Sequence, residues 1–397
     1  MKYLLLVGFG NIARSFFASL IYKNFLEYSV ILVLRINNWA YKALINSYLR
    51  GTVFKVVVVI SYKGIVNCNN CLVVELIGDN YYARDLLLRT LLTSNCFLTA
   101  NKFLLYKNIR LVSRYLFTRV FFEAAIGGGL PFVKNFLMLR TIATVKSCCA
   151  IFNGTTNFLL TLLPVNDFRF DMALKESAIL GLSEANPVKD ICGFDALNKI
   201  VITAYLLCNK YSYCKYIYVT SLPVDNWFYW FVSNLGYTYR YVSFFIIKGY
   251  VFHIEVSLCL FKTVNSFTLT YFDYNSVTVV TKLHGYFTIA AKGAGATVTT
   301  YSLLSDFEYF SSHCGVVPGV SVNSSLYAMC LFRSFYIFLL DLEAVPDFFM
   351  LLLLLRCVVS FFITTKLVVL FKFRLGFSSL RKLLAFFRNR VLYCRVL

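Results

Sequence analysis

The chain has 397 residues, a hydrophobic fraction of 59% and a formal net charge of +20 at pH 7. This length is enough for two or three domains with sizeable cores, so size excludes no class of globular enzyme. A charge of this sign suits nucleic acid or an anionic membrane, but the basic residues are scattered, and only the tail after Lys366 is basic without an acid. We interpret the charge as solubilising an apolar chain and expect no nucleic-acid or membrane partner.

The 13 cysteines form no recognisable metal or disulfide framework. Cys68 and Cys71 have CxxC spacing, and Cys148 and Cys149 are adjacent, but neither pair comes with the second half of a zinc site. A redox pair is the alternative for the CxxC, although it precedes an apolar run and does not open a helix. Free thiols in a reducing, cytoplasmic compartment are the simpler interpretation.

Two apolar segments raise the question of a membrane. The run before Gly8 is only about five residues long, shorter than the core of roughly 7 to 15 residues in a secretory signal. We therefore predict that it is a buried strand. The segment 348–363 contains Arg356 near its middle and is shorter than the roughly 20 residues of a spanning helix, so we expect a buried helix there.

The first 125 residues alternate short aliphatic runs with longer amphipathic segments, which is typical of a parallel sheet flanked by helices. Between the first strand and the helix after it lies a GxGxxA turn, Gly8-Phe9-Gly10-Asn11-Ile12-Ala13. Its glycines let backbone N–H groups approach a pyrophosphate, and Ala13 lets the helix pack closely on the sheet. We predict a Rossmann domain that binds a dinucleotide over residues 1–125. The expected strands are 3–7, 30–34, 53–60, 72–77, 96–99 and 120–122.

Polar residues follow three of these strands, at the sheet edge where ligands bind in such folds. Arg35 follows the second strand, where an NAD-specific site would offer an acid to the ribose. A guanidinium there favours the 2′-phosphate of NADP, and the alternative is an ordinary surface arginine. Asp79 follows the fourth strand and Lys102 the fifth. We expect Lys102 at the mouth of the cofactor crevice, with a solvated lysine at a helix start as the alternative.

The stretch 123–199 holds most of the glycine-rich turns and closely spaced acids. The turn Gly127-Gly128-Gly129 exposes backbone carbonyls, which suits a monovalent cation or a close approach to nicotinamide. Helical spacing follows at 157–163, 170–180 and 194–207.

Asp195 and Lys199 are four residues apart in the last of these helices and so lie on one face. One interpretation is a surface ion pair. The other adds Glu184 and Asp190 from the preceding loop and predicts a pocket for a zwitterionic substrate.

Beyond residue 239 the pattern becomes strand-rich and predicts an antiparallel sheet to about residue 300, within an α+β domain at residues 126–310. A second glycine-rich turn, 292–297, precedes a helix-like run. His253, His284 and His313 have no partner at ligand spacing and are interpreted as structural. Residues 330–397 read as a βαββαβ order, which predicts a ferredoxin-like module.

Taken together, the motifs resemble homoserine dehydrogenases of the monofunctional type with a C-terminal ACT module. The resemblance extends over nearly the whole chain, and the segment 180–199 is its most specific part. The matching segments are GFGNIA (8–13), VVELIG (73–78), TANK (99–102), EAAIGGGLP (123–131), NGTTNF (153–158), LGLSEANPVKDICGFDALNK (180–199) and GAGAT (293–297).

The resemblance implies NAD(P)-dependent interconversion of L-homoserine and L-aspartate 4-semialdehyde, on the route to threonine and methionine, by a homodimer or homotetramer. It implies Lys199 as the acid/base at the reacting oxygen, with Asp195 as its substrate-binding partner. It also implies that Glu184 and Asp190 hold homoserine and that Lys102 touches both cofactor and substrate. Further cofactor contacts are implied for Gly181 and Gly295, and a sodium site for the carbonyls of Glu123, Ile126, Gly128 and Leu130.

One departure from the family pattern concerns the C-terminal module. An ACT module usually has a Pro-Gly-like turn after its first strand, whereas this chain has Asp341-Leu-Glu-Ala-Val-Pro346. Threonine feedback is therefore not expected to follow from the fold, and a decayed, degenerate ACT-like module is the alternative.

The competing enzyme class is another Rossmann-type amino-acid or semialdehyde dehydrogenase. The acylating kind is disfavoured because no Cys–His pair stands out. The remaining alternative is a decayed, basic membrane-associated protein.

Overall fold

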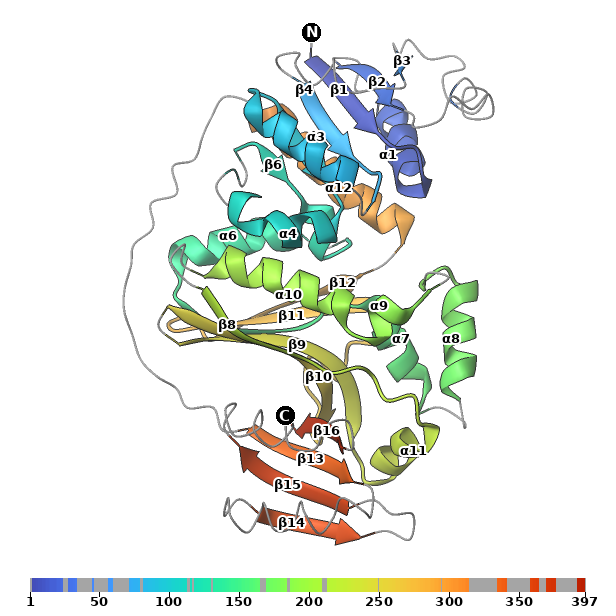
Figure 1. Ribbon diagram of the computed structural model, residues 1–397, viewed down its shortest axis with the longest axis vertical. Coiled ribbons are helices and arrows are strands. Elements are labelled where there is room, and N and C mark those ends of the chain that lie inside the picture. Colours follow the sequence, from blue (N-terminus) through green and yellow to red (C-terminus); the bar gives the residue numbers. More distant parts are fainter. Residues whose placement is uncertain are drawn as a thin grey trace. The chain divides into compact units, whose positions relative to one another are not determined.

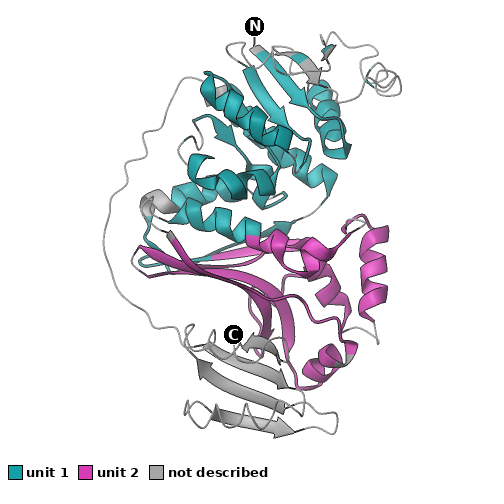
Figure 2. Cartoon of the chain, in the orientation of Figure 1, with its two compact units in different colours: residues 1–145, 198–212, 279–324 teal, residues 146–197, 213–278, 325–397 magenta. Residues whose placement is uncertain are grey.

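A computed structural model shows two sheets with their helices (Figure 1). Residues 1–145, 198–212 and 279–324 make one compact unit, and residues 146–197, 213–278 and 325–397 make the other (Figure 2). The structure describes residues 2–23, 28–33, 45, 56–59, 71–78, 81–112, 115, 118–129, 131–164, 169–183, 186–208, 213–248, 250–293, 295–313, 334–340, 358–363, 369–375 and 391–396.

The first sheet has six parallel strands in the order β3-β2-β1-β4-β5-β6. This is the strand order of dinucleotide-binding α/β folds, and it confirms the predicted Rossmann-like sheet. Each described strand begins and ends within a few residues of its prediction. The strands are β1 (Lys2–Val7), β2 (Tyr28–Val33), β3 (Val56–Val59), β4 (Cys71–Glu75), β5 (Cys96–Thr99) and β6 (Val120–Phe121).

Burial explains why these short runs become parallel strands. Leu4, Leu5 and Leu6 in β1 are all fully buried, because helices cover both faces of a parallel sheet and leave no solvent side. In the first helix, α1 (Asn11–Tyr22), Ala13, Phe16, Phe17 and Leu20 are the buried residues, and their spacing makes one apolar stripe. Ala13 is completely buried, as expected of a small residue where helix and sheet pack closely.

The helix α12 (Ala296–His313) belongs to the same unit, although it comes almost 300 residues after α1. Its residues Leu303, Leu304, Phe307 and Phe310 join the core that contains Phe16, and the rings of Phe16 and Phe307 meet edge to face with centroids 6.3 Å apart. The sequence predicted this helix but not its partner. The other helices of the unit are α3 (Tyr81–Leu92), α4 (Lys102–Val112), α5 (Glu123–Ile126) and α6 (Phe132–Ile142).

The second sheet has the strand order β12-β11-β7-β9-β10-β16-β13-β15-β14, and β8 also pairs with β10. The predicted antiparallel region is confirmed by β9 and β10, which pair along their whole length. Two strands were not predicted, β7 (Val145–Ile151) and β8 (Tyr213–Val219). The other strands before residue 300 are β9 (Thr238–Lys248), β10 (Val251–Phe261), β11 (Tyr274–Thr281) and β12 (Tyr286–Lys292).

Four strands follow in the last part of the chain, and they pair antiparallel in the order β16-β13-β15-β14. Their bounds are β13 (Ser334–Leu340), β14 (Val358–Ile363), β15 (Val369–Leu375) and β16 (Val391–Val396). The remaining helices are α7 (Gly154–Leu162), α8 (Phe170–Ile179), α9 (Val188–Ile191), α10 (Phe194–Leu207) and α11 (Asn226–Asn234). The helix expected over 348–363 is wrong at its end, because residues 358–363 form the strand β14, which pairs with β15. Residues 348–357 and the turn 341–346 lie outside the described residues.

Two further observations concern the expectations from composition. Of the helices that the structure describes, none combines the length and the apolar character needed to cross a membrane. Among the described residues, Cys71, Cys96, Cys148, Cys149, Cys192, Cys208, Cys214 and Cys259 are not in disulfide bonds.

Arg240 on β9 holds the loop that leads from β10 to β11. Its side chain is 2% exposed, and its guanidinium donates to the carbonyl oxygens of Phe267, Thr268 and Thr270 at 2.9–3.2 Å. A loop that turns inside a protein must have its backbone carbonyls satisfied, and a buried arginine can serve several of them at once. Arg240 is therefore one of the side chains that hold this loop in place.

Replacing Arg240 with Met should lower the free energy of unfolding by about 3 kcal/mol or more, because three buried carbonyl oxygens each lose a charged donor. Urea unfolding followed by circular dichroism would measure it. Arg169→Met is the matched control, since Arg169 forms only an exposed pair with Asp171 and should change the stability by less than about 0.5 kcal/mol. Equal losses in the two variants would contradict this role for Arg240.

Candidate functional site

The turn after β1 requires glycine at its first position. Gly8 has a φ of +99°, and a Cβ atom there would lie 2.7 Å from the carbonyl oxygen of Leu76. The backbone N–H of Leu76 in turn donates to the carbonyl of Val7 at 2.9 Å. Gly10 differs, because no atom lies within 4 Å of the place that its Cβ would take. Gly8 thus allows the chain to pass close to β4, and Gly10 leaves space open.

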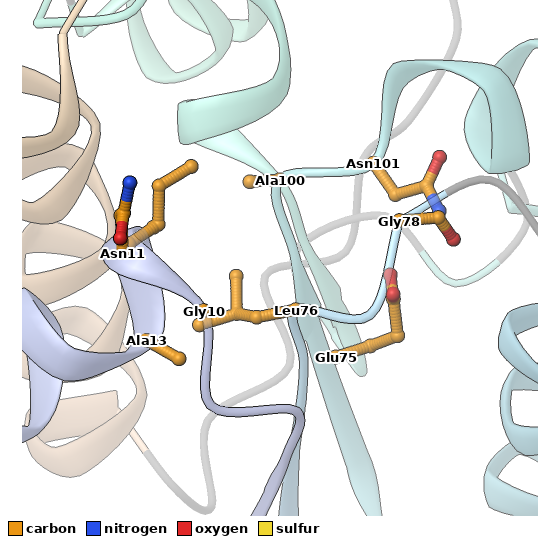
Figure 3. Close-up of a pocket in the computed structure, with 9 residues that line it drawn as sticks. Gly10, Asn11, Ala13, Glu75, Leu76, Gly78, Ala100 and Asn101 are labelled. Carbon is orange, nitrogen blue, oxygen red and sulfur yellow. The ribbon is translucent and has the colours of Figure 1, made fainter. Parts of the chain in front are cut away.

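That space is a pocket of about 270 Å³ at the carboxyl ends of β1, β4 and β5 (Figure 3). The strand order reverses between β1 and β4, which is where α/β folds of this kind bind their ligands. Figure 3 shows Gly10 and Ala13 on the α1 side, with Gly78 and Asn101 opposite. The lining residues are Gly10, Asn11, Ile12, Ala13, Glu75, Leu76, Gly78, Ala100 and Asn101.

This pocket suits the pyrophosphate of a dinucleotide. The first N–H groups of α1 have no helical partner and carry the positive end of the helix dipole, and Gly10 adds no side chain that would keep a phosphate away. Of the five contacts predicted in this turn, Gly10, Asn11, Ile12 and Ala13 line the pocket, whereas Gly8 is not part of its lining. Lys102, the first residue of α4, is half-buried and directly follows the lining residue Asn101. Arg35 lies outside the described residues.

Glu75 is a pocket residue that the sequence prediction missed. It is fully buried, and its carboxylate accepts hydrogen bonds from the Thr99 hydroxyl at 2.6 Å and the Ile77 backbone N–H at 2.9 Å. Asn101 extends the network, because its amide donates to the carbonyl of Gly78 at 2.6 Å. Burial raises the pKa of Glu75, and the bond from Thr99 opposes that rise. The network fixes the turn after β4 on one side of the pocket.

The glycine turn 127–129 packs against the second glycine-rich turn. A Cβ atom on Gly128, whose φ is +65°, would meet the Gly293 carbonyl oxygen at 2.5 Å, and the N–H of Gly129 donates to Lys292 O at 3.2 Å. The Ser302 hydroxyl of α12 donates to the carbonyl of Gly128. Gly295, an implied cofactor contact, is exposed with a φ of +112° just before α12.

Glu123, implied as a sodium ligand through its carbonyl, uses its side chain to cap a helix. The side chain is 1% exposed and accepts hydrogen bonds from the N–H groups of Val133 and Lys134 at 2.6 and 3.2 Å. Ile126 is buried as well, and Leu130 lies outside the described residues. Among the residues that the structure describes, no cluster of three or more His, Cys, Asp or Glu could hold a metal ion.

A second buried acid lies beside Glu123. Asp306 of α12 accepts from the backbone N–H of Glu123 at 2.7 Å, and the Lys134 ammonium lies 3.6 Å from its other oxygen. Burial and the nearby Asp306 raise the pKa of Glu123 to about 8. Burial also raises the pKa of Asp306 to about 6, against the attraction of Lys134. These acids tie α5 and α6 to α12.

The acids predicted to hold the substrate lie on α9 and α10. Asp190 on α9 and Asp195 on α10 both accept hydrogen bonds from the Asn153 amide, at 2.7 and 2.9 Å. Asp195 and Lys199 are 9% and 5% exposed, so the interpretation as a surface ion pair is wrong. Their spacing on α10 places them on one helix face. In this group of residues the sequence prediction missed Asn153, although Asn153 begins the motif NGTTNF.

The two remaining predicted site residues of this region are Gly181 and Glu184. Gly181 is exposed, has a φ of +69° and follows the end of α8, where the N–H of Leu182 donates to the carbonyl of Ser177. This is the usual way in which a helix ends at glycine. Glu184 lies outside the described residues.

These features define a class of protein: an α/β protein with a Rossmann-like nucleotide-binding sheet, a second sheet, and a buried acid–lysine pair on one helix. Residues 131–307 match the family model for homoserine dehydrogenase. The resemblance to homoserine dehydrogenases that the motifs indicated is thereby confirmed, and the matched region includes Asn153, Asp190, Asp195 and Lys199.

Individual relatives agree. The chain is 30% identical over 242 residues to homoserine dehydrogenase of Helicobacter pylori, across 59% of this chain and 56% of that protein. It thus spans little more than half the length of the curated relatives it matches. The fold is similar to that of a homoserine dehydrogenase from Thiobacillus denitrificans, with a TM-score of 0.79 and 20% identity over 100% of this chain and 98% of that one. A hyperthermophilic archaeal homoserine dehydrogenase in complex with NADPH has a TM-score of 0.60 and 19% identity over 79% and 98%.

Alanine substitutions at the two glycines of the first turn should have different effects. Gly8→Ala should lower the free energy of unfolding by about 2 kcal/mol or more, because φ is positive and the Cβ meets backbone. Gly10→Ala should leave stability within about 1 kcal/mol but weaken NADPH binding about tenfold or more, since its Cβ enters the pocket. Thermal unfolding and a fluorescence titration separate these effects. The same defect in both variants would contradict the assigned roles.

The buried Glu123 should make stability depend on pH. Its folded-state pKa of about 8 lies above the ordinary value of 4.5, so the folded protein keeps a proton that the unfolded chain releases. This contribution to stability is complete below about pH 4.5 and is lost as the pH rises through about 8. The raised pKa of Asp306 likewise makes the folded protein less stable as the pH rises, but over a lower pH range, up to about 6.

Glu123→Gln should therefore flatten the fall in unfolding free energy between about pH 5 and 8, measured by urea unfolding at constant salt. The control is Glu308→Gln, an exposed residue of the same helix as Asp306 that pairs with Lys23. A slope unchanged by Glu123→Gln, or flattened equally by the control, would remove Glu123 as the origin.

Proposed function

We propose that this protein is an NAD(P)-dependent oxidoreductase that interconverts L-homoserine and L-aspartate 4-semialdehyde. The observation that carries the proposal is the buried pair Asp195–Lys199 on one face of α10, within the region that matches the homoserine dehydrogenase family. A lysine and an acid are almost never fully buried unless they are paired, and a buried lysine and acid on one helix face are candidates for a functional site. The glycine-lined pocket at the switch point of the first sheet supports the dinucleotide part of the proposal.

In this proposal the chemistry at the reacting oxygen belongs to Lys199. A bound nicotinamide cofactor supplies the hydride that moves to or from the substrate carbon. As the aldehyde carbon gains a hydride, negative charge develops on its oxygen, and a cationic lysine stabilises that charge and then donates the proton. Asp195, one helical turn earlier, orients the substrate beside Lys199. Asp190 and Glu184 supply negative charge for the substrate's ammonium group, and Lys102 touches both cofactor and substrate.

The nucleotide is held by the turn Gly8–Ala13, with Gly181 and Gly295 as further contacts. NADP is the proposed cofactor, because Arg35 follows the strand whose end meets the ribose in related folds. A sodium ion on the carbonyls of Glu123, Ile126, Gly128 and Leu130 is part of the proposal through the family resemblance. Its test is whether sodium, compared with potassium, raises activity.

The domain roles follow the same resemblance. Residues 1–125 bind nucleotide, 126–310 bind substrate and join the subunits of a homodimer or homotetramer, and 330–397 form a degenerate ACT-like module. The antiparallel order β16-β13-β15-β14 supports the last assignment, because a βαββαβ chain folds in that order. A reducing, cytoplasmic location completes the proposal.

The test is the oxidation of L-homoserine by the full-length chain, followed at 340 nm with NADP and NAD in parallel. We expect turnover that favours NADP. Lys199→Ala and Lys199→Met should lower kcat about a hundredfold to ten-thousandfold, the usual loss of a general acid/base, and should leave NADPH binding unchanged. No homoserine-dependent reduction of either nucleotide by the wild type would refute the proposed function.

The matched control is Lys189→Met, which removes an exposed lysine of α9 in the same motif. It should retain the wild-type kcat. If Lys199→Met turned over like the wild type, Lys199 would have no part in the proton transfer. If Lys189→Met lost as much activity as Lys199→Met, the effect would be one of general charge and not of the buried lysine.

A further inference from the structure

Asn153 is held in one orientation at the start of α7. It is the N-cap of that helix, and its Oδ1 atom accepts from the backbone N–H of Thr156 at 2.7 Å. The Thr156 hydroxyl returns a hydrogen bond to the carbonyl of Asn153 at 3.1 Å, and Asn153 is 4% exposed. Because the cap occupies the oxygen end of the amide, the nitrogen end must point the other way.

That nitrogen faces two acids at once. Nδ2 donates to Asp190 Oδ1 at 2.7 Å and to Asp195 Oδ2 at 2.9 Å. An amide nitrogen has two protons, so each carboxylate receives one, and hydrogen bonds to carboxylates are stronger than those between neutral groups. One neutral side chain therefore connects α7 to both α9 and α10.

Two carboxylates that bond to the same amide nitrogen lie close enough to repel each other. Without a donor between them they would turn apart or take up a proton. A cationic bridge such as lysine would remove the repulsion but would also neutralise the negative charge. The amide keeps the acids together and leaves their charge unchanged. Two carboxylates held side by side suit a small cationic group, such as the ammonium group of an amino acid.

We propose that Asn153 is a positioning residue for the substrate: it fixes the carboxylates of Asp190 and Asp195 at the separation that an amino acid's ammonium group requires. Through Asp195 it also fixes the acid that stands one turn before Lys199 on α10. The inference rests on the proposed function and deepens it. The competing explanation is that Asn153 serves only as the cap of α7.

Two substitutions separate these explanations. Asn153→Ser keeps a capping oxygen but has no amide to bridge the acids, and Asn153→Asp keeps both cap and shape but puts a third carboxylate beside the other two. Asn153→Ser should fold with a melting temperature close to that of the wild type, whereas Asn153→Asp should melt at a lower temperature, because a third buried carboxylate repels the other two. We expect the KM for homoserine to rise about tenfold in Asn153→Ser and further in Asn153→Asp, with the KM for NADP unchanged in both.

Asn157→Ser is the matched control. Asn157 is a second buried asparagine one turn along α7, and its amide donates to the carbonyls of Thr270, Phe272 and Tyr274. This variant should lose thermal stability and keep the wild-type KM for homoserine. If Asn153 positions the acids, Asn153→Ser raises the KM for homoserine and keeps the melting temperature, whereas Asn157→Ser does the reverse. A purely structural role for Asn153 does not predict this difference.

Binding of homoserine, measured by calorimetry in the presence of NADPH, accompanies the kinetics so that the outcomes are distinguishable. A wild type that oxidises homoserine, with Asn153 variants that keep its KM, would overturn the inference and leave the proposed function standing. Variants in which the KM for NADP rises as much as that for homoserine would also overturn it. A wild type that neither binds nor oxidises homoserine would overturn both.

Discussion

A carboxylate buried in an apolar protein must be met by hydrogen-bond donors, and this constraint shapes the described part of the chain more than any other. The acids Glu75, Glu123, Asp195 and Asp306 are at most 9% exposed. Each accepts from a neighbour: Glu75 from Thr99, Glu123 from the N–H groups that open α6, Asp306 from the backbone of Glu123, and Asp195 from Asn153. A buried carboxylate without such donors would cost several kcal/mol or be neutralised.

The donors come from distant parts of the sequence, so each acid joins segments that the chain separates. Glu75 joins the ends of β4 and β5 at the pocket of the first sheet. Asp306 joins α12 to α5 through a bond across 183 positions. These bonds place polar groups where the surrounding core is otherwise aliphatic and aromatic. Buried acids are therefore found only where such donors are available.

Glycine supplies the second condition, which is close approach. At Gly8 and Gly128 a side chain would collide with backbone, at Leu76 and Gly293 respectively. Both contacts lie within the first unit and bring together loops that are far apart in the sequence, without side chains between them. A nucleotide phosphate can approach backbone N–H groups only where side chains are missing, so the same property that permits the fold there also permits binding.

The sequence by itself determined the parallel sheet and the positions of its strands within a few residues, because aliphatic periodicity and the motif GxGxxA act over short stretches of chain. Most candidate site residues came from the family resemblance and stay predictions. It also predicted α10 with Asp195 and Lys199 on one face. Only the tertiary structure decided that this pair is buried, that Asn153 bridges Asp190 and Asp195, that Glu75 lines the pocket, and that α12 packs on α1. Those facts depend on contacts between residues 24 to almost 300 positions apart. No local pattern encodes which distant donor meets a given acid, because that partner is chosen by the packing of whole helices and sheets.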